Sequence, residues 1–484
     1  MIEHIPADQR RPRLTAAGLP DGEVDRFLAD LQAWEAQFAA PGAARGRRLD
    51  ADLPAMQAIG RQGRQLLARL PLKSARDEAA KAAGHAVFHL LAAAGRHFFR
   101  AHAHAVYREL TREGTAPLRV EELARRAAER LPGVMPSDAE LLEESQRMQK
   151  DKDGLELNQG LFFSQLFADR AIGAHLIRAM LRPLPQSLAL LDEFRAKGSV
   201  QLERALVEAE GHVGRLTFQN PRYLNAEDTT TMIPFEIGTD LILLHPDLRI
   251  GVMRGGVVDH PKYAGRRVFS AGINLSHIYH GQQTYMSFLI KNMGFFNKAH
   301  RGLVLDPADS LEAPLDEPED TLEKPWVAAV DTFAIGGGCQ ILLLMDYVIA
   351  EAGSYFNLPA RKEGIIPGLA NLRMPRFTGE SLAREAIMFD KAFPVESPEA
   401  RTVVNQVVPA DDMDAAIEAC VAKASGSGMT SIGGNRKALR IALEPMDDLR
   451  RYLATYAYEQ LFCHLSEDLI RNLEKNWNAQ NKKR

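Results

Sequence analysis

The residues with the clearest chemical potential are three consecutive glycines, Gly336–Gly338, which stand between two apolar runs. The run before them, Pro325–Val330, is apolar throughout and predicts a short buried strand. The run after them, Cys339–Met345, fits a buried helix that begins at or near the glycines. Glycine lets the backbone turn sharply and approach a ligand, and the free N–H groups at a helix start favour negative charge. The pattern predicts an anion site, with a tight strand-to-helix turn that binds nothing as the alternative.

A second segment, Arg266–Leu275, has the same order of elements: a short strand, a turn of small residues and then a helix. Two such turns could each donate one backbone N–H to the same oxygen. That arrangement is an oxyanion hole, which stabilises negative charge as it develops on a carbonyl oxygen. We therefore expect the two turns to lie side by side in the fold.

Three ordered motifs resemble the crotonase (enoyl-CoA hydratase/isomerase) superfamily. Ser270–Leu275 stands where that family has an Ala-Gly-x-Asp turn, Ile335–Gln340 matches its Gly-Gly-Gly-Cys-Glu turn, and Glu363–Gly368 matches its Gly-x-x-Pro-Gly segment. The resemblance implies that the N–H groups of Ile273 and Gly337 hold the thioester oxygen of an acyl-CoA as it becomes an enolate. It also implies that the rest of both turns surrounds the substrate, namely Ser270, Ala271, Gly272, Asn274, Gly336 and Gly338.

Two positions depart from the hydratases of this family. Hydration of an enoyl-CoA uses two glutamates as general acid and base. One of them should follow the glycine turn, where this chain has Gln340, and the other should follow Pro359, where it has Ala360. An amide and a methyl group cannot move protons at neutral pH. We therefore expect the chain to stabilise an enolate without adding water to a double bond.

Further stretches are similar to the cofactor-independent dioxygenases of this superfamily, which act on 3,5-dihydroxyphenylacetyl-CoA. The similarity runs from about residue 155 to 465 and is carried by Leu224–Asp228, His260–Tyr263, Arg267–Leu275, Lys324–Asp331, Phe333–Gln340, Lys362–Gly368, Ala370–Arg373 and Pro398–Arg401. It implies that the α-carbon of an arylacetyl-CoA loses a proton, that the carbanion reacts directly with dioxygen, and that thioester cleavage releases CoA and an arylglyoxylate. Neither a metal nor an organic cofactor is expected.

The same resemblance implies roles for five side chains outside the two N–H donors. Glu227 and His260 would contact the aryl ring or its hydroxyls, Gln340 would lie beside the reacting carbon, Ile365 would wall a dry pocket for oxygen, and Gln460 would contact substrate or CoA. Each has a structural alternative. Glu227 could cap a following helix, His260 could be a loop residue before Pro261, and Gln340 could be a buried, hydrogen-bonded amide.

The ring-binding arginine of these dioxygenases has no counterpart here. Asn292 stands at the matching place, directly after Lys291. Without the planar, charged guanidinium group of an arginine, the pocket for the aryl ring recognises different ring substituents. Lys291 could take its place if the helix shifts by one residue, so a related arylacetyl-CoA with other ring substituents is also expected as a substrate.

Hydrophobic periodicity divides the chain into three parts: an all-helical N-terminal domain at 1–205, an α/β core at 206–410 and a C-terminal helical region at 411–484. The family resemblance implies that the core is a crotonase-like ββα superhelix and that the C-terminal helices cover the active site and build trimers. Expected strands are Val213–Phe218, Arg249–Arg254, Val268–Ala271, Val327–Val330, Tyr347–Ala350 and Tyr355–Leu358. Expected helices include Asp21–Ala39, Leu53–Leu70, Ala75–Leu110, Leu161–Leu181, Gln186–Arg195, Thr229–Leu244, Gln283–Gly302, Ala410–Ala424, Asn435–Leu443 and Asp447–Trp477.

Composition narrows the classes of protein that the chain could belong to. Its 484 residues carry a net charge of −4, which predicts no nucleic-acid partner, and no apolar run approaches a membrane span. The three cysteines lack metal or disulfide spacing, which indicates a cytoplasmic protein. The histidines His97, His102 and His104 lack the spacing of a metal site and are expected to be structural. The family resemblance implies a homotrimer or a dimer of trimers.

Two other functions remain open from the sequence. A crotonase-type isomerase or hydrolase would use the same enolate without oxygen. A non-catalytic protein that binds acyl-CoA would keep the fold and lose the chemistry. Anaerobic turnover distinguishes the first from an oxygenase, and binding without turnover identifies the second.

Overall fold

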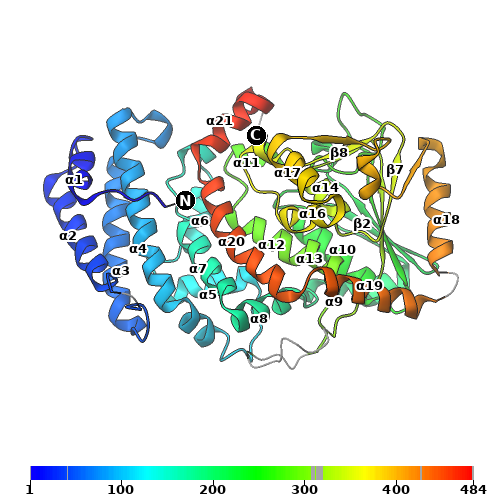
Figure 1. Ribbon diagram of the computed structural model, residues 1–484, viewed down its shortest axis with the longest axis horizontal. Helices are drawn as coiled ribbons and strands as arrows, with labels where there is room; N and C mark the ends of the chain where they lie inside the picture. The colour runs from blue at the N-terminus through cyan, green and yellow to red at the C-terminus, as the bar shows by residue number, and fades with distance from the viewer. Residues whose placement is uncertain (1, 41, 307–310, 312–319, 426–427, 482–484) are drawn as a thin grey trace.

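The computed structural model describes residues 2–40, 42–306, 311, 320–425 and 428–481. Its N-terminal part is helical and its central part is α/β, and the two lie at opposite ends of the long axis (Figure 1). The helices before the first strand are α1 (Ala7–Thr15), α2 (Asp21–Gln37), α3 (Leu49–Arg69), α4 (Glu78–Leu110), α5 (Val120–Arg130), α6 (Asp138–Glu144), α7 (Leu157–Ala168), α8 (Arg170–Met180) and α9 (Pro185–Lys197). Alanine and leucine, both strong helix formers, fill α4, and Asp77 caps it by accepting a hydrogen bond from the N–H of Ala80 at 2.8 Å.

A seven-stranded sheet forms the centre of the α/β part, in the order β1-β2-β3-β4-β5-β7-β10. Its strands are β1 (Ser199–Gln201), β2 (Ala205–Glu210), β3 (Val213–Phe218), β4 (Ile250–Gly255), β5 (Trp326–Val330), β7 (Tyr347–Glu351) and β10 (Gln406–Val408). The first three pair antiparallel and the others parallel. All five residues of β5 are buried because helices cover both faces of the sheet.

Successive side chains of a strand point to opposite faces of the sheet, and each face packs against a different helix. Val327 and Ala329 of β5 pack with residues of α18 (Met413–Ser425). Ala328 and Val330 belong to the larger core, to which α10 (Met232–Leu244) contributes. Figure 1 shows α18 on the outer side of the sheet and α10 on the side toward the helical part. Because side chains alternate between the two faces along β5, Ala328 and Val330 face the larger core and Val327 and Ala329 face α18.

A second sheet of three strands holds the glycine turn. It has the order β6-β8-β9, with β6 (Phe333–Ile335) parallel to β8 (Tyr355–Asn357) and β9 (Ala392–Pro394) antiparallel to β8. The glycine turn leads directly from β6 into α14 (Gly337–Leu342). The predicted strand Val327–Val330 is confirmed as β5, whereas β6, a further strand in the other sheet, was not predicted.

The remaining helices surround these sheets. They are α11 (Leu275–Tyr279), α12 (Tyr285–Lys291), a π-helical turn (Asn292–Phe296), α13 (Asn297–Arg301), α15 (Ala360–Glu363), α16 (Ala370–Thr378), α17 (Glu380–Phe389), α19 (Met429–Leu443), α20 (Met446–His464) and α21 (Glu467–Trp477). None of the helices in the described ranges is both long enough and apolar enough to cross a membrane.

Helix α20 joins the two parts of the molecule. It crosses between the N-terminal helices and the α/β part (Figure 1), and it packs against α7 and α8. Gly160 of α7 makes this contact close, because a Cβ there would lie 2.7 Å from Cδ2 of Leu461. Arg450 of α20 donates to the carbonyls of Phe167 and Ala168 at 2.5 and 2.9 Å. Residues of the C-terminal region therefore bind the N-terminal helices directly.

Several predicted elements were wrong in extent or type. Val268–Ala271 is not a strand: it makes one isolated bridge instead, from Ser270 to Ala334. Gln283–Gly302 is interrupted by the π-helical turn, and Leu161–Leu181 and Asp447–Trp477 are each two helices. Strands β1 and β2 were not expected, because their alternation is short and bounded by charged residues. The expected domain boundary at 205/206 falls inside the hairpin that these two strands form.

Candidate active site

The two glycine-containing turns lie against each other, as their sequence predicted. The N–H of Ile335 donates to the carbonyl of Ser270 at 2.9 Å, which ties the end of β6 to the second turn. Gly272 adopts a φ of +79°, and a Cβ at this position would lie 2.7 Å from the carbonyl oxygen of Ile335 and 3.0 Å from the nitrogen of Gly337. Only glycine permits both this conformation and this approach.

The N–H groups of Ile273 and Gly337 are free to bind an anion. The neighbours of Ile273 are engaged, since the carbonyl of Gly272 accepts from Glu227 at 2.6 Å and the N–H of Asn274 donates to Glu227 at 2.7 Å. Gly337 is the first residue of α14, so its N–H has no acceptor within the helix. In the described ranges, neither group donates a hydrogen bond. Both residues line one cavity.

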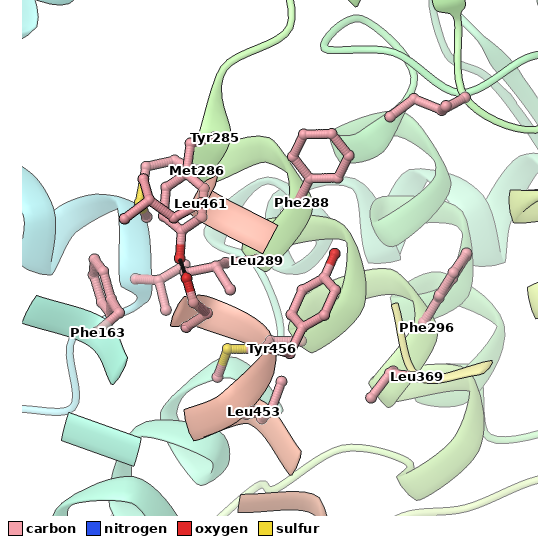
Figure 2. Packing of buried hydrophobic residues seen from close by; sticks show 14 of the residues in the cluster. Phe163, Tyr285, Met286, Phe288, Leu289, Phe296, Leu369, Leu453, Tyr456 and Leu461 are labelled. Atoms are coloured by element: carbon pink, nitrogen blue, oxygen red, sulfur yellow. Dashed lines mark hydrogen bonds between the residues drawn. The ribbon is translucent and has the colours of Figure 1, made fainter. Parts of the chain in front are cut away.

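This cavity is small and partly enclosed. Its volume is about 20 Å³, which is space for about one water-sized molecule. Its walls are made by residues of the two turns, of α12, α14 and α20, and of the 358–368 segment: Ile273, Phe288, Lys291, Gly336, Gly337, Gln340, Leu358, Ala360, Glu363, Ile365, Ile366, Pro367, Gly368 and Tyr456. Figure 2 shows Phe288 and Tyr456 within the buried apolar packing, with the hydroxyl of Tyr456 directed toward Phe288 in this view.

A buried ion pair stands at one side of the cavity. Nζ of Lys291 lies 2.8 Å from Oε2 of Glu227 and donates to Oε1 of Gln340 at 3.3 Å. Nε2 of Gln340 donates in turn to the carbonyl of Gly368 at 2.6 Å. The Glu227 carboxylate lies directly against Gly337, where any Cβ would overlap it. Glu227 is therefore an ion-paired residue behind the glycine turn, and it does not cap a helix.

A π-helical turn directly follows Lys291, at the position where the ring-binding arginine was expected. Lys291 is the last residue of α12, and the π-helical turn begins at Asn292. A π-turn inserts one extra residue into the helical register. Lys291 points to the cavity, whereas Asn292 turns away and donates to the carbonyl of Phe288 at 2.8 Å and to the hydroxyl of Tyr456 at 3.0 Å.

Sequence reasoning missed Glu363 as a residue of the site. Glu363 ends the short helix α15, lines the cavity and is only 5% exposed. Burial raises the pKa of its carboxyl to about 7, the nearby Lys291 cation opposes this rise, and the Asp390 carboxylate adds to it. The available signal was a charged residue inside the otherwise apolar Gly-x-x-Pro-Gly segment.

The other predicted residues divide into two groups. Ile365 lines the cavity. Ser270, Asn274 and Gln460 are buried and support the backbone around it: Oγ of Ser270 accepts from the N–H of Gly272 at 3.0 Å, Oδ1 of Asn274 caps α11, and Oε1 of Gln460 accepts from the N–H of Ile366 at 2.8 Å. Gly338 packs its backbone on Ser270, and Ala271 packs with Val258 and Phe333.

His260 lies outside this cavity. It is half-buried in a loop, where its Nδ1 accepts from the N–H of Lys262 at 3.3 Å and its ring lies 5.8 Å from that of Tyr263. Tyr263 packs on Phe333 and belongs to a separate apolar cluster. The structure therefore does not bring His260 together with Ile273, Gly337 and Gln340.

The histidines of α4 do not contribute to the cavity. His102 pairs with Asp52 at 2.7 Å, His104 contacts the carbonyl of Gln165 at 3.1 Å, and His97 stacks on Phe38. Among the described residues, one group with metal-ligating atoms close together is formed by Glu3, His85 and His89. Nδ1 of His89 already accepts from the N–H of Glu3 at 3.0 Å, which competes with a metal.

Comparison with known proteins agrees with this geometry. The sequence model of the family Enoyl-CoA hydratase/isomerase matches residues 317–477. A protein of Amycolatopsis orientalis named (3,5-dihydroxyphenyl)acetyl-CoA 1,2-dioxygenase is 42% identical over 407 residues, which cover 84% of this chain and 91% of that protein. A probable enoyl-CoA hydratase of Rhizobium meliloti is 26% identical over 43% of this chain and 70% of its own length.

Solved enoyl-CoA hydratases are more distant relatives. The crystal structure of an enoyl-CoA hydratase from Mycobacterium avium subsp. paratuberculosis is 19% identical, covers 56% of this chain and 98% of its own, and has a TM-score of 0.45.

Proposed function

The chain belongs to the crotonase (enoyl-CoA hydratase/isomerase) superfamily, and from this premise we propose that it is a dioxygenase of an arylacetyl-CoA. The substrate is 3,5-dihydroxyphenylacetyl-CoA or a related thioester. The observation that carries the proposal is the pair of free N–H groups, Ile273 and Gly337, which face one cavity beside an amide, Gln340, where hydratases have a glutamate.

The proposed reaction needs three properties of this site. Loss of an α-proton places negative charge on the thioester oxygen, and two preorganised donors lower the barrier to that enolate by several kcal/mol. The α-carbon then forms a bond to dioxygen, and the resulting peroxide attacks the thioester carbon and expels CoA. Arylacetyl-CoA and O₂ together give arylglyoxylate and free CoA, so the atoms balance without a metal or an organic cofactor.

The proposed substrate contacts follow from the walls of the cavity. Gln340 lies beside the reacting carbon, Ile365 and Phe288 border the space for oxygen, and Lys291, paired with Glu227, meets the ring hydroxyls in place of an arginine. A lysine is a compact point charge rather than a planar fork, so it accommodates other ring substituents. The cavity is too small for an aryl ring, so the residues around it must move when the thioester binds.

Ser270, Ala271, Gly272, Asn274, Gly336 and Gly338 keep their proposed place around the thioester, as the backbone of the two turns. Asn292 and Gln460 act in the proposal through Tyr456 and Ile366, which they hydrogen-bond and which line the cavity. His260 does not line the cavity, so a contact between His260 and the aryl ring is proposed only from the family resemblance. A cytoplasmic homotrimer or dimer of trimers is part of the proposal, and light scattering after size-exclusion chromatography measures the assembly.

The test is oxygen consumption with parallel CoA release, measured on phenylacetyl-CoA and 3,5-dihydroxyphenylacetyl-CoA after treatment with a chelator. We expect one mole of CoA for each mole of oxygen, and the preferred ring reports what Lys291 recognises. CoA release without oxygen uptake would contradict the dioxygenase and identify a hydrolase. Tight thioester binding without either product would identify a non-catalytic acyl-CoA-binding protein.

A further inference from the structure

Three titratable side chains line the oxyanion cavity: Lys291, Glu363 and Tyr456. Two of them are engaged. Nζ of Lys291 lies 2.8 Å from Oε2 of Glu227, and the hydroxyl of Tyr456 accepts from Nδ2 of Asn292 at 3.0 Å. Burial also raises the pKa of Tyr456 well above its ordinary value, so it stays protonated near neutral pH. Neither side chain is free to accept a proton.

Glu363 differs from both. Glu363 lines the cavity and is 5% exposed, and the pKa of its carboxyl is perturbed by burial and two nearby charges, with no hydrogen bond from any residue that the structure describes. The helix that carries it is fixed from outside, since Asn472 and Asn476 of α21 donate to the carbonyls of Arg361 and Lys362 at 3.3 and 2.8 Å. Its acceptor atoms are therefore unoccupied while its position is held.

We propose that Glu363 is the catalytic base that removes the α-proton of the thioester. This assignment rests on the proposed function and adds the residue that the two N–H donors alone do not supply. The carboxylate takes the proton as the C–H bond breaks, the electron pair moves to the thioester oxygen held by Ile273 and Gly337, and Glu363 becomes a neutral carboxylic acid. The neutral carboxylic acid therefore places no negative charge beside the enolate.

The charged surroundings fit a base that works near neutral pH. The groups that face Glu363 are Lys291 from α12, Asp390 at the end of α17 and the phenol of Tyr456 from α20, while α21 contributes the amides of Asn472 and Asn476. Asp390 is paired with Arg361. A base is most effective when its pKa lies near the working pH, and the carboxyl of Glu363 has a pKa of about 7.

The experiment is hydrogen–deuterium exchange at the α-carbon of 3,5-dihydroxyphenylacetyl-CoA, measured without oxygen in D₂O by mass spectrometry of the recovered thioester. Glu363→Gln keeps the size of the side chain and removes the base. We expect about a 100-fold or greater loss of exchange, since positioned general bases contribute about 10² to 10⁴. The dissociation constant for the thioester should change by less than about threefold.

A matched control and a second measurement keep this test independent of folding. Glu385→Gln alters an exposed carboxylate on α17 and should leave exchange unchanged. In the unaltered protein, exchange should rise with pH through about 7 and level off above about 8, because only the ionised carboxylate accepts a proton. Glu363→Asp should restore part of the exchange with the same dependence on pH.

The possible outcomes test the role of Glu363 separately from the proposed dioxygenase reaction. The assignment of Glu363 is overturned if Glu363→Gln exchanges the α-proton at a rate within threefold of the unaltered protein. It is also overturned if the exchange rate of the unaltered protein does not change between pH 6 and 8. Neither result contradicts the proposed dioxygenase reaction. Exchange that depends on Glu363 without oxygen uptake supports the base and contradicts the dioxygenase. Absence of exchange in the unaltered protein, with either arylacetyl-CoA, overturns both.

Discussion

Glu363 and Glu444 are the same side chain at nearly the same burial, 5% and 1% exposed, in two regions with opposite electrostatics. Glu444 lies between α19 and α20, where Arg373 donates to both of its oxygens at 2.9 Å and Arg376 donates at 2.8 Å. These cations outweigh the cost of burial and hold the pKa of Glu444 well below its usual range. Glu363 has no such partners, and its pKa rises to about 7.

The difference teaches how to recognise a reactive group in this fold. Burial alone does not distinguish the two residues, and neither does residue type. What distinguishes them is whether the carboxylate is surrounded by donors or borders a cavity. A buried carboxylate whose acceptors are all used stabilises the fold, whereas one whose acceptors face a cavity can exchange protons with a ligand.

The largest effect is expected from Glu444→Gln. This change removes the carboxylate from the buried guanidinium of Arg373 and from the half-buried guanidinium of Arg376. Breaking one partner of a buried ion pair costs roughly 3 to 5 kcal/mol. Chemical unfolding at pH 7 measures the loss, and a change below about 1 kcal/mol would show that the arginines find other partners and that the pairing at Glu444 is dispensable.

A smaller effect of opposite sign is expected from Glu363→Gln on the stability of the protein without ligand. Because the pKa of Glu363 is raised from 4.5 to about 7 in the folded state, its stabilising contribution is complete below pH 4.5 and is lost as pH rises through 7. Between pH 4.5 and 8, the unfolding free energy of the variant should therefore rise by about 3 kcal/mol relative to that of the unaltered protein. The unfolding free energies of both proteins are measured at pH 4.5 and at pH 8. If the variant differs from the unaltered protein by the same amount at both pH values, the raised pKa is contradicted.

Lys291→Met should sharpen the comparison by making the surroundings of Glu363 more negative. Lys291 lowers the pKa of Glu363, so its removal should shift the pH dependence of α-proton exchange upward by about one pH unit. The profile is measured between pH 6 and 9 on the same thioester. A shift to lower pH would show that another group controls the profile.

The smallest effect is expected where a carboxylate is paired at the surface. Glu380 and Arg384 are 2.6 Å apart on α17, and their side chains are 71% and 67% exposed. Solvent screens such a pair, so Glu380→Gln should change the unfolding free energy by less than about 0.5 kcal/mol. A loss comparable to that of Glu444→Gln would remove the distinction between buried and exposed pairs.

Much of the fold and part of the site could be predicted from local patterns. The runs Val327–Val330 and Tyr347–Ala350 are strands, and the glycines Gly336–Gly338 lead into a helix, because these features depend on residues adjacent in the chain. The two turns were expected to lie side by side, and the bridge between Ser270 and Ala334 agrees with this expectation. The roles of Glu227, His260 and Gln340, and the choice between Lys291 and Asn292, were left undecided.

The sequence by itself determined the family, the two donor turns and the absence of the hydratase glutamates at Gln340 and Ala360, because each of these is a matter of residue type at adjacent positions. The tertiary structure alone decided which side chains have partners. Lys291 pairs with Glu227, which lies 64 positions away, and the arginines around Glu444 come from α13 and α16. The pKa of a carboxyl depends on such distant neighbours, so the contrast between Glu363 and Glu444 exists only in the folded chain.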